Sequence, residues 1–268
     1  MTELEAATFP RVSHLLTPVQ PLYPLFASVV EGRQRGRIFA DRATKPEAAL
    51  VCHIPGRIYA VCGNPANRGF LSALPALLAT GPPSETAWWG FVTDAVAWGA
   101  PLDIRFAGTL QKGRGISFDL HPETFRRRPD WRTRIPVGYE MRGMTGDLVD
   151  VTAAQLPEGF PFPWESADHF TANGFGLALW RGDEVASIAF AYAGAVQSGH
   201  IEIAIYTAEA HRRRGCATLA CSTFIEHALD LGMTPTWHCD AGNPGSIALA
   251  TTLGFQRRGE HTMYSLPE

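Results

Sequence analysis

The sequence predicts a protein of the α/β class, and three observations carry that expectation. In the C-terminal half, a strand-like run, a basic turn that ends in Gly215, an amphipathic helix, a second strand and a helix capped by Asn243 follow in order. Apolar residues make up 46% and charged residues 18% of the chain, so a sizeable core can be buried. The 268 residues fit two domains, which we expect at residues 1–130 and 131–268.

Three short β-like runs open the N-terminal half after a proline-rich start. They are GRIFAD (36–41), AALVCHI (48–54) and RIYAVCG (57–63), and Pro55-Gly56 predicts a hairpin turn between the last two. Helices are expected at residues 67–79 and 85–98, followed by a strand at 102–111. A basic stretch that contains prolines, residues 125–136, is interpreted as the inter-domain connector, for which a solvated helix end and linker is the simplest role.

The elements of the C-terminal half are more regular. Strands are expected at residues 137–144, at two runs within 174–196 joined by Arg181-Gly182-Asp183, and at residues 200–207, 234–240 and 260–266. Small and apolar side chains recur at three- and four-residue spacing from Cys216 to Leu231, which predicts an amphipathic helix ended by Gly232. A second helix is expected to run from its cap at Asn243 to Gly254.

Charge and cysteine content argue against several classes of protein. The net charge is −3, whereas a dedicated nucleic-acid binder normally carries a basic excess. The five cysteines form no C-x-x-C pair, which disfavours a disulfide framework or a zinc site. No stretch approaches the roughly 18 apolar residues that span a bilayer, and no signal peptide is visible. We therefore expect a cytoplasmic protein with no metal and with neither nucleic acid nor membrane as a partner.

The turn after residues 200–207 is the most informative stretch. Three consecutive arginines, Arg212 to Arg214, directly precede Gly215. The first N–H groups of a helix are unpaired and carry a partial positive charge, so they favour an anion. Gly215 and Ala217 leave room for a phosphate near the backbone, and the arginines can add charge-assisted hydrogen bonds. This arrangement predicts a pyrophosphate site rather than a nucleic-acid patch.

The run from Arg212 to Ala217 resembles the Q/R-x-x-G-x-G/A acetyl-CoA loop of the GNAT N-acetyltransferase superfamily. IEIAIYT before the loop and TPTWHCDAGNPGSIALATTLGF after it extend the resemblance over residues 136–268, which are similar to the zwittermicin-resistance-type subgroup. The resemblance implies a mixed, mostly antiparallel sheet flanked by helices, whose fourth and fifth strands splay to admit the pantetheine arm. The N-terminal half loosely resembles a degenerate GNAT-like lobe of such proteins.

The resemblance also implies an activity, the direct transfer of an acetyl group from acetyl-CoA to the amine of a small molecule in a ternary complex. The residues implied to bind the cofactor are Ile205, Tyr206 and Thr207 for the pantetheine, Arg212, Arg213, Arg214, Gly215, Cys216, Ala217 and Thr218 for the pyrophosphate, and Asn243 and Ser246 from the next helix. Two alternatives stay open: Asn243 as a plain helix cap, and Arg213 and Arg214 as solvated charges.

Direct transfer requires a base, because the acceptor amine must first lose a proton. Along residues 200–207 the isoleucines face one side, and the other side carries His200, Glu202, Ala204 and Tyr206. A carboxylate on a covered strand is costly unless it has a partner or a function. Glu202 is therefore the leading base candidate. A paired structural carboxylate and a water relayed from His200 are the alternatives.

The departing thiolate needs a proton, and the resemblance places the usual tyrosine where this chain has Ala250. Tyr264 and Tyr206 are candidate substitutes, although each position is also typical of a packed aromatic. Cys216 is expected to pack rather than react. The run His238-Cys239-Asp240 cannot form one nucleophile set, because consecutive strand residues point to opposite faces.

No motif identifies the acceptor. Four aromatic side chains precede the strands of residues 174–196, and they line either an acceptor site or a small core under a loop: Phe160, Phe162, Trp164 and His169. The missing tyrosine leaves open an acyl-CoA sensor without catalysis, and the arginines at 126–128 and 212–214 leave open nucleic-acid binding. In the N-terminal half the nearest candidate for a second loop, GRQRGR (32–37), precedes a strand, so we expect one acetyl-CoA per chain.

Overall fold

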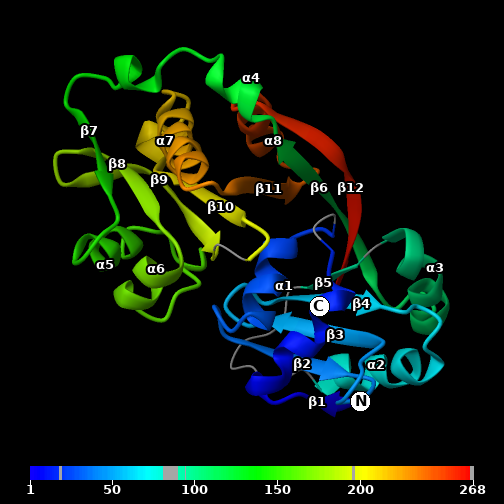
Figure 1. The fold of residues 1–268 in the computed structure, drawn as a ribbon. Coiled ribbons are helices and arrows are strands. Elements are labelled where there is room, and N and C mark those ends of the chain that lie inside the picture. The colour runs from blue at the N-terminus through cyan, green and yellow to red at the C-terminus, as the bar shows by residue number, and fades with distance from the viewer. Residues whose placement is uncertain (18–19, 81–89, 94, 195–196, 266–268) are drawn as a thin grey trace. The chain divides into compact units, whose positions relative to one another are not determined.

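The computed structural model describes residues 1–17, 20–80, 90–93, 95–194 and 197–265, which form two compact units (Figure 1). The first unit contains Met1–Ser117, Asp240–Gly242 and Gly259–Glu268, and the second contains Phe118–Cys239 and Asn243–Arg258. Strands β6 (Gln111–Leu120) and β12 (Phe255–Ser265) each contribute residues to both units. The division therefore differs from the expected one at residue 130, and the last residues of the chain belong to the first unit.

The first unit is a mixed sheet covered by short helices. Its elements are β1 (Thr2–Glu3), a 3-10 helix (Ala6–Leu15), α1 (Tyr23–Val30), β2 (Gly36–Ala40), β3 (Ala48–His53), β4 (Ile58–Gly63), α2 (Arg68–Thr80), β5 (Gly90–Thr93) and α3 (Ala95–Phe106). Strands β1 to β4 pair antiparallel in sequence order, and β5 lies parallel to β4. The end of β12 then pairs with β5. The three predicted strands and their Pro-Gly turn are confirmed.

The sequence-based assignment of residues 85–111 is wrong for residues 90–93 and 102–110, whereas residues 95–98 of the predicted helix do lie in α3. Residues 90–93 of the predicted helix form β5, and residues 85–89 lie outside the described part. The alternating run from Leu102 suggested a strand, but α3 continues to Phe106, with Leu102 and Phe106 one helical turn apart in the core and Ile104 82% exposed. An apolar residue at every second position over five residues fits a strand, but the first and last of them are also four residues apart, as on one face of a helix. Here the segment is helical.

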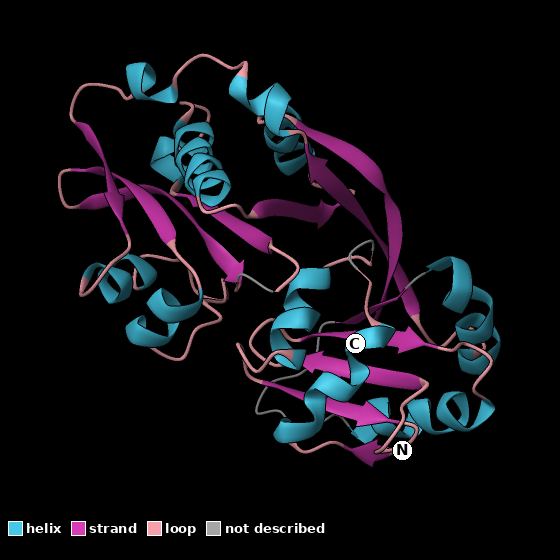
Figure 2. Cartoon of the chain, viewed as in Figure 1, coloured by secondary structure: helices cyan, strands magenta, loops and turns pink. Residues whose placement is uncertain are grey.

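The second unit is a mostly antiparallel sheet with helices on both faces (Figure 2). Its elements are α4 (Pro122–Arg126), a 3-10 helix (Trp131–Arg134), β7 (Tyr139–Gly143), α5 (Leu148–Ala153), α6 (Ala167–Asn173), β8 (Gly176–Arg181), β9 (Glu184–Ala193), β10 (His200–Thr207), a 3-10 turn (Glu209–His211), α7 (Cys216–Asp230), β11 (Thr234–Asp240) and α8 (Pro244–Thr252). Strands β7 to β10 pair antiparallel, and β11 lies parallel to β10. The predicted fold class is confirmed.

The two faces of the second sheet have different coverings. On one face, Cys216 and Leu219 of α7 pack against Leu179 and Ala186 of the sheet. The register pairs Tyr206 with Ile188 and Ala204 with Phe190, so Tyr206 and Phe190 share the opposite face. Phe160, from the loop before α6, contacts both Tyr206 and Phe190 there, with ring centroids 6.0 Å and 6.3 Å away. The face that carries the candidate base is therefore covered by the aromatic loop rather than by α7.

Both units repeat one order of elements. In the first unit it is β2, β3, β4, α2, β5, α3 and β6, and in the second β8, β9, β10, α7, β11, α8 and β12. In each, three antiparallel strands are followed by a helix that crosses to a parallel strand. Each unit therefore contains one strand–turn–helix junction at the same place in the order, β4–α2 in the first and β10–α7 in the second.

Candidate functional site

The turn before α7 is shaped to expose backbone N–H groups. Arg213 has φ 59° and Gly215 has φ 82°, so two of the three residues that precede the helix are left-handed. Backbone that enters the left-handed region in this way turns successive N–H groups toward one anion-binding concavity. The N-cap of α7 is Gly215, which has no side chain to cap the first turn, and the helix begins at Cys216. A Cβ placed on Gly215 would find no atom within 4 Å, so the space beside the backbone is open.

Contacts behind the turn hold it in place while its basic side chains stay exposed. His211 is buried, and its Nδ1 lies 2.8 Å from the Tyr139 hydroxyl on β7. The Nε of Arg212 donates to the carbonyl of Thr207 over 3.2 Å. Residues 212–215 are all exposed. The predicted pyrophosphate loop is therefore anchored on one side and open on the other, which fits an anionic ligand.

Strands β10 and β11 separate soon after they begin. The described ladder between them joins His200 to Thr234, Ile201 to Pro235 and Glu202 to Thr236. From Ile203 to Thr207 the ladder of β10 is with β9, and its register shifts between Glu202 and Ile203. A run of β10 backbone that ends at the basic turn is thus not engaged by β11 in the described ladder. This is the splay that the resemblance implied for a pantetheine arm.

Glu202 lies at the last paired position before the strands separate. Glu202 is 4% exposed, and its carboxylate accepts a hydrogen bond from the Thr236 hydroxyl. Nδ1 of His238 lies 3.0 Å from each carboxylate oxygen. The prediction that Glu202 points away from the isoleucine side is consistent with this position. The pairing of His238 with Glu202 depends on the parallel register of β10 and β11, so the sequence alone groups His238 only with its own neighbours.

The other polar groups on this face lie at either end of β10. His200 contacts Ser198 through Nδ1 and Oγ, 2.9 Å apart, and burial lowers the pKa of His200. Tyr206 is half-buried beside Phe160. Of the groups predicted for this face, the structure brings His200, Glu202 and Tyr206 onto one strand, with Tyr206 nearest the basic turn.

Tyr264 does not share this face. It lies in the first unit, where it is 2% exposed and stacks on Phe91 with ring centroids 5.0 Å apart. Burial raises the pKa of Tyr264, with the nearby Asp103 adding to the effect. The packed-aromatic interpretation fits this position. Cys216 packs in the α7 cluster as expected, and burial raises the pKa of its thiol.

The helix after β11 begins with a polar cap. Oδ1 of Asn243 accepts from the backbone N–H of Ser246 over 3.0 Å, and the Ser246 hydroxyl accepts from Nε1 of Trp237 at the same distance. Asn243 therefore caps α8, which the sequence left open as an alternative role. Its amide Nδ2 takes no part in this bond and can donate to another group, so a cofactor contact is compatible with the cap.

The aromatic run before β8 forms a compact cluster. Trp164 is 7% exposed, donates through Nε1 to the carbonyl of Ala191 over 2.8 Å, and contacts His169 and Phe170. Phe162 packs on Phe170, with ring centroids 5.4 Å apart. These side chains form a small core under the loop, while Phe160 reaches Tyr206. Phe160 is thus the member of the set that borders the strand of the candidate base.

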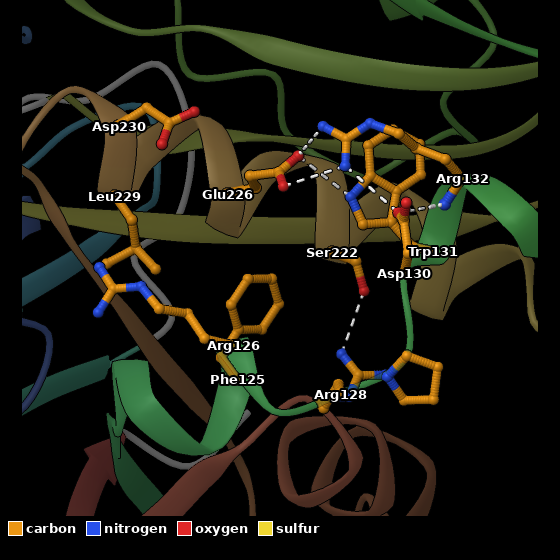
Figure 3. A pocket seen from close by; sticks show the side chains of 11 residues that line it. Phe125, Arg126, Arg128, Asp130, Trp131, Arg132, Ser222, Glu226, Leu229 and Asp230 are labelled. Atoms are coloured by element: carbon orange, nitrogen blue, oxygen red, sulfur yellow. Dashed lines mark hydrogen bonds and ion pairs between the residues drawn. The ribbon is translucent and has the colours of Figure 1, made fainter.

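The basic connector is bound to α7 rather than free in solvent (Figure 3). Trp131 and Arg132 both donate to Glu226, and Arg132 also lies over the Trp131 ring. Arg128 donates to the Ser222 hydroxyl over 3.2 Å. The connector and α7 line a cavity of about 290 Å³. Most of these residues are exposed after the end of α4, as a solvated helix end and linker implies, but three of them also bond to α7. Their charges are partly satisfied within the unit, which weakens the nucleic-acid alternative.

Comparisons with known proteins agree with this geometry. A family model described as GNAT acetyltransferase matches residues 19–264. The chain is 28% identical to the uncharacterized N-acetyltransferase YdfB of Bacillus subtilis (strain 168), over 98% of this chain and 99% of the relative. A GCN5-related N-acetyltransferase-like protein from Streptococcus suis matches with a TM-score of 0.71 at 21% identity, over 98% and 99% of the two chains. A tandem GNAT protein from the clavulanic acid biosynthesis pathway, solved without AcCoA, matches with a TM-score of 0.61 at 12% identity, over 96% of this chain and 94% of its own.

Proposed function

The chain belongs to the GNAT acetyltransferase family, and we propose that it acetylates the amine of a small molecule by direct transfer in a ternary complex. GNAT acetyltransferases use acetyl-CoA, which supplies the activated acetyl group as a thioester. The single observation that carries the proposal is the uncapped start of α7, open beside Gly215 and preceded by a strand that has separated from β11.

The residues around this opening fit the cofactor. Backbone N–H groups of residues 215–218 and the exposed arginines would hold the pyrophosphate. The freed backbone from Ile205 to Thr207 would pair with the pantetheine, and Asn243 and Ser246 would approach it from α8. Arg212 is the strongest of the basic contacts we propose, because its Nε is already fixed on Thr207 and less side-chain freedom is lost on binding.

Glu202 serves the proton step in this proposal. One ammonium N–H bond breaks, and the proton passes to the carboxylate of Glu202 directly or through a water. The freed amine forms the new N–C bond as the C–S bond breaks, and the nitrogen then gives up a second proton, which balances the one that the departing thiolate takes up. Tyr206 is our candidate donor of the proton that the thiolate takes up, since it lies on the same face of β10. Tyr264 is the less favoured donor because it is buried in the first unit.

For the acceptor we propose only a chemical class. The aromatic loop on the Glu202 face, and Phe160 in particular, suits an amine with an apolar or aromatic part. The similarity of the motifs to the zwittermicin-resistance-type subgroup suggests a polar antibiotic or a metabolite amine. No helix in the described part of the chain is long and apolar enough to cross a membrane. We propose that the protein works in the cytoplasm, where free thiols such as its five cysteines are stable.

A screen of amines for thiol release tests the proposal. Acetyl-CoA is incubated with the full chain and with amines, aminoglycosides, amino acids or peptides, and free CoA is measured together with the mass of the acetylated product. The expected result is CoA release that depends on one class of amine, with a product heavier by one acetyl group. Tight acetyl-CoA binding without turnover of any amine would favour the second candidate, an acyl-CoA sensor, which the alanine at position 250 motivates.

A further inference from the structure

The carboxylate of Glu202 is held by two donors from β11. Thr236 is its partner in the parallel ladder, and His238 follows two residues later, so the three side chains share one face of the sheet. The side chains of Glu202 and His238 are 5% and 6% exposed. A carboxylate buried this deeply is costly unless its oxygens accept hydrogen bonds.

The identity of the donors follows from their chemistry. In its proposed role as a base Glu202 is ionised, and an ionised carboxylate only accepts hydrogen bonds, so that role requires the proton between Glu202 and His238 to belong to Nδ1 of the imidazole. That nitrogen lies 3.0 Å from both oxygens and can donate to either. The Thr236 hydroxyl also lies 3.3 Å from the carbonyl of Ile201, but its contact with Glu202 is the closer of the two. Oε2 lies within reach of both Thr236 and His238, whereas Oε1 has only His238 near it, so a second lone pair of Oε1 is the one left for a substrate proton.

We propose that His238 and Thr236 are positioning residues for acetyl transfer, which together fix the carboxylate of Glu202 at the point where β10 and β11 separate. The inference rests on the proposed function of Glu202 in the proton step. Neither residue touches the reacting atoms in this scheme. They limit the rotation of the Glu202 side chain at this position, and misplacing a base by a small distance reduces its effectiveness strongly.

Matched substitutions separate the donor role from a packing role. Thr236→Val keeps the shape of the side chain and removes the hydroxyl, whereas Thr236→Ser keeps the hydroxyl. His238→Leu removes the N–H donor, and His238→Asn restores one close to the place of Nδ1. We expect kcat to fall on the order of 10–100-fold in the Val and Leu variants, with the Kd for acetyl-CoA unchanged. The Ser and Asn variants should recover most of that loss, and Thr234→Val, an exposed change on the same strand, should have no effect.

Two outcomes would overturn the proposal. Wild-type kcat in folded Thr236→Val and His238→Leu variants, with a slow Glu202→Gln enzyme, would show that the base needs no positioning. Nitrogen-15 NMR of the wild-type protein at neutral pH gives the second readout, which needs no variant and no acceptor: a proton on Nδ1 of His238 is expected, and an unprotonated Nδ1 contradicts the donor role. If the wild-type protein acetylates no amine, the proposed function fails, while the NMR result still decides whether His238 donates to Glu202.

Discussion

The two strand–turn–helix junctions of the molecule occupy the same place in the order of elements but differ in how the helix begins. In the first unit, Oδ1 of Asn67 accepts from the backbone N–H of Phe70 over 3.0 Å, which caps α2. The Asn67 amide in turn donates to Asp41. In the second unit the N-cap of α7 is Gly215, which has no side chain and so leaves the first N–H groups of the helix without such a cap. A side chain therefore accepts a hydrogen bond from the first turn of α2, whereas the first N–H groups of α7 can bind a ligand.

The glycine near each junction and the strand pairing beside it also show that the first junction is closed and the second is open. Gly63 and Gly215 are both left-handed, but a Cβ on Gly63 would meet the carbonyl of Glu47 at 2.2 Å, whereas Gly215 has nothing within 4 Å. The described ladder of β4 and β5 joins Ile58–Val61 to residues 90–93 and covers most of β4. The ladder of β10 and β11 covers only the first residues of β10. The first junction is closed by packing, and the second is open.

Charge adds to the contrast. Burial raises the pKa of Asp41, but hydrogen bonds from the N–H groups of Glu47 and Ala48 and from Arg42 and Asn67 lower it overall. An ionised carboxylate therefore lies beside the start of α2, where a pyrophosphate would be repelled. Three arginines lie before α7 instead. The comparison teaches that the order of elements alone does not make a cofactor site, because the cap, the ladder and the local charge decide whether the helix start can accept an anion.

The largest expected effect comes from the carboxylate of β10, for which β4 has no equivalent acidic residue. Glu202→Gln keeps the volume of the side chain and one acceptor oxygen but cannot take up a proton. We expect kcat to fall roughly 10²–10⁴-fold at neutral pH, while acetyl-CoA binding stays nearly unchanged. The loss should shrink at higher pH, because more of the acceptor amine is already unprotonated. Steady-state rates across that pH range test this, and wild-type kcat throughout would reduce Glu202 to a structural carboxylate.

A second, smaller effect is expected at the open glycine. Gly215→Glu places a Cβ and a negative charge where the pyrophosphate is expected. Each charge-assisted hydrogen bond that is lost should cost about 1.5–3 kcal/mol, which weakens the Kd for acetyl-CoA roughly 10–150-fold. Titration calorimetry on the folded variant measures this. Undiminished affinity would remove the turn from the cofactor site.

The same titration has a matched control. Gly182, in the turn between β8 and β9, is also left-handed with open space around it, so Gly182→Glu brings the same strain and charge to another place. Its affinity for acetyl-CoA should equal that of the wild type. The wild-type titration should end at one acetyl-CoA per chain. A second equivalent bound would show that the capped junction also accepts the cofactor, and the comparison between the two units would then be broken.

The sequence predicted the open junction better than the closed one, for a physical reason. The arginine–glycine turn, the periodic helix and the Asn243 cap are local signals, and the structure has all three. Strand β5 was missed because a buried run of four residues has no period that distinguishes it from a helix. The compact units differ from the expected division at residue 130 because β6 and β12 contribute to both, which no local pattern records. The partners of Glu202 depend on a register between strands more than thirty residues apart.

The smallest expected effect uses the two asparagine caps as a matched pair. Asn67→Ala and Asn243→Ala each remove one capping hydrogen bond and should each lower the free energy of unfolding by about 1 kcal/mol. Only Asn243→Ala should also weaken the Kd for acetyl-CoA, roughly 2–10-fold, because its Nδ2 is proposed to donate to the cofactor. Urea unfolding and titration calorimetry on both variants measure the two effects. Equal affinities in both would leave Asn243 with its cap alone, and a loss of affinity in Asn67→Ala would mean that the first junction contributes to binding after all.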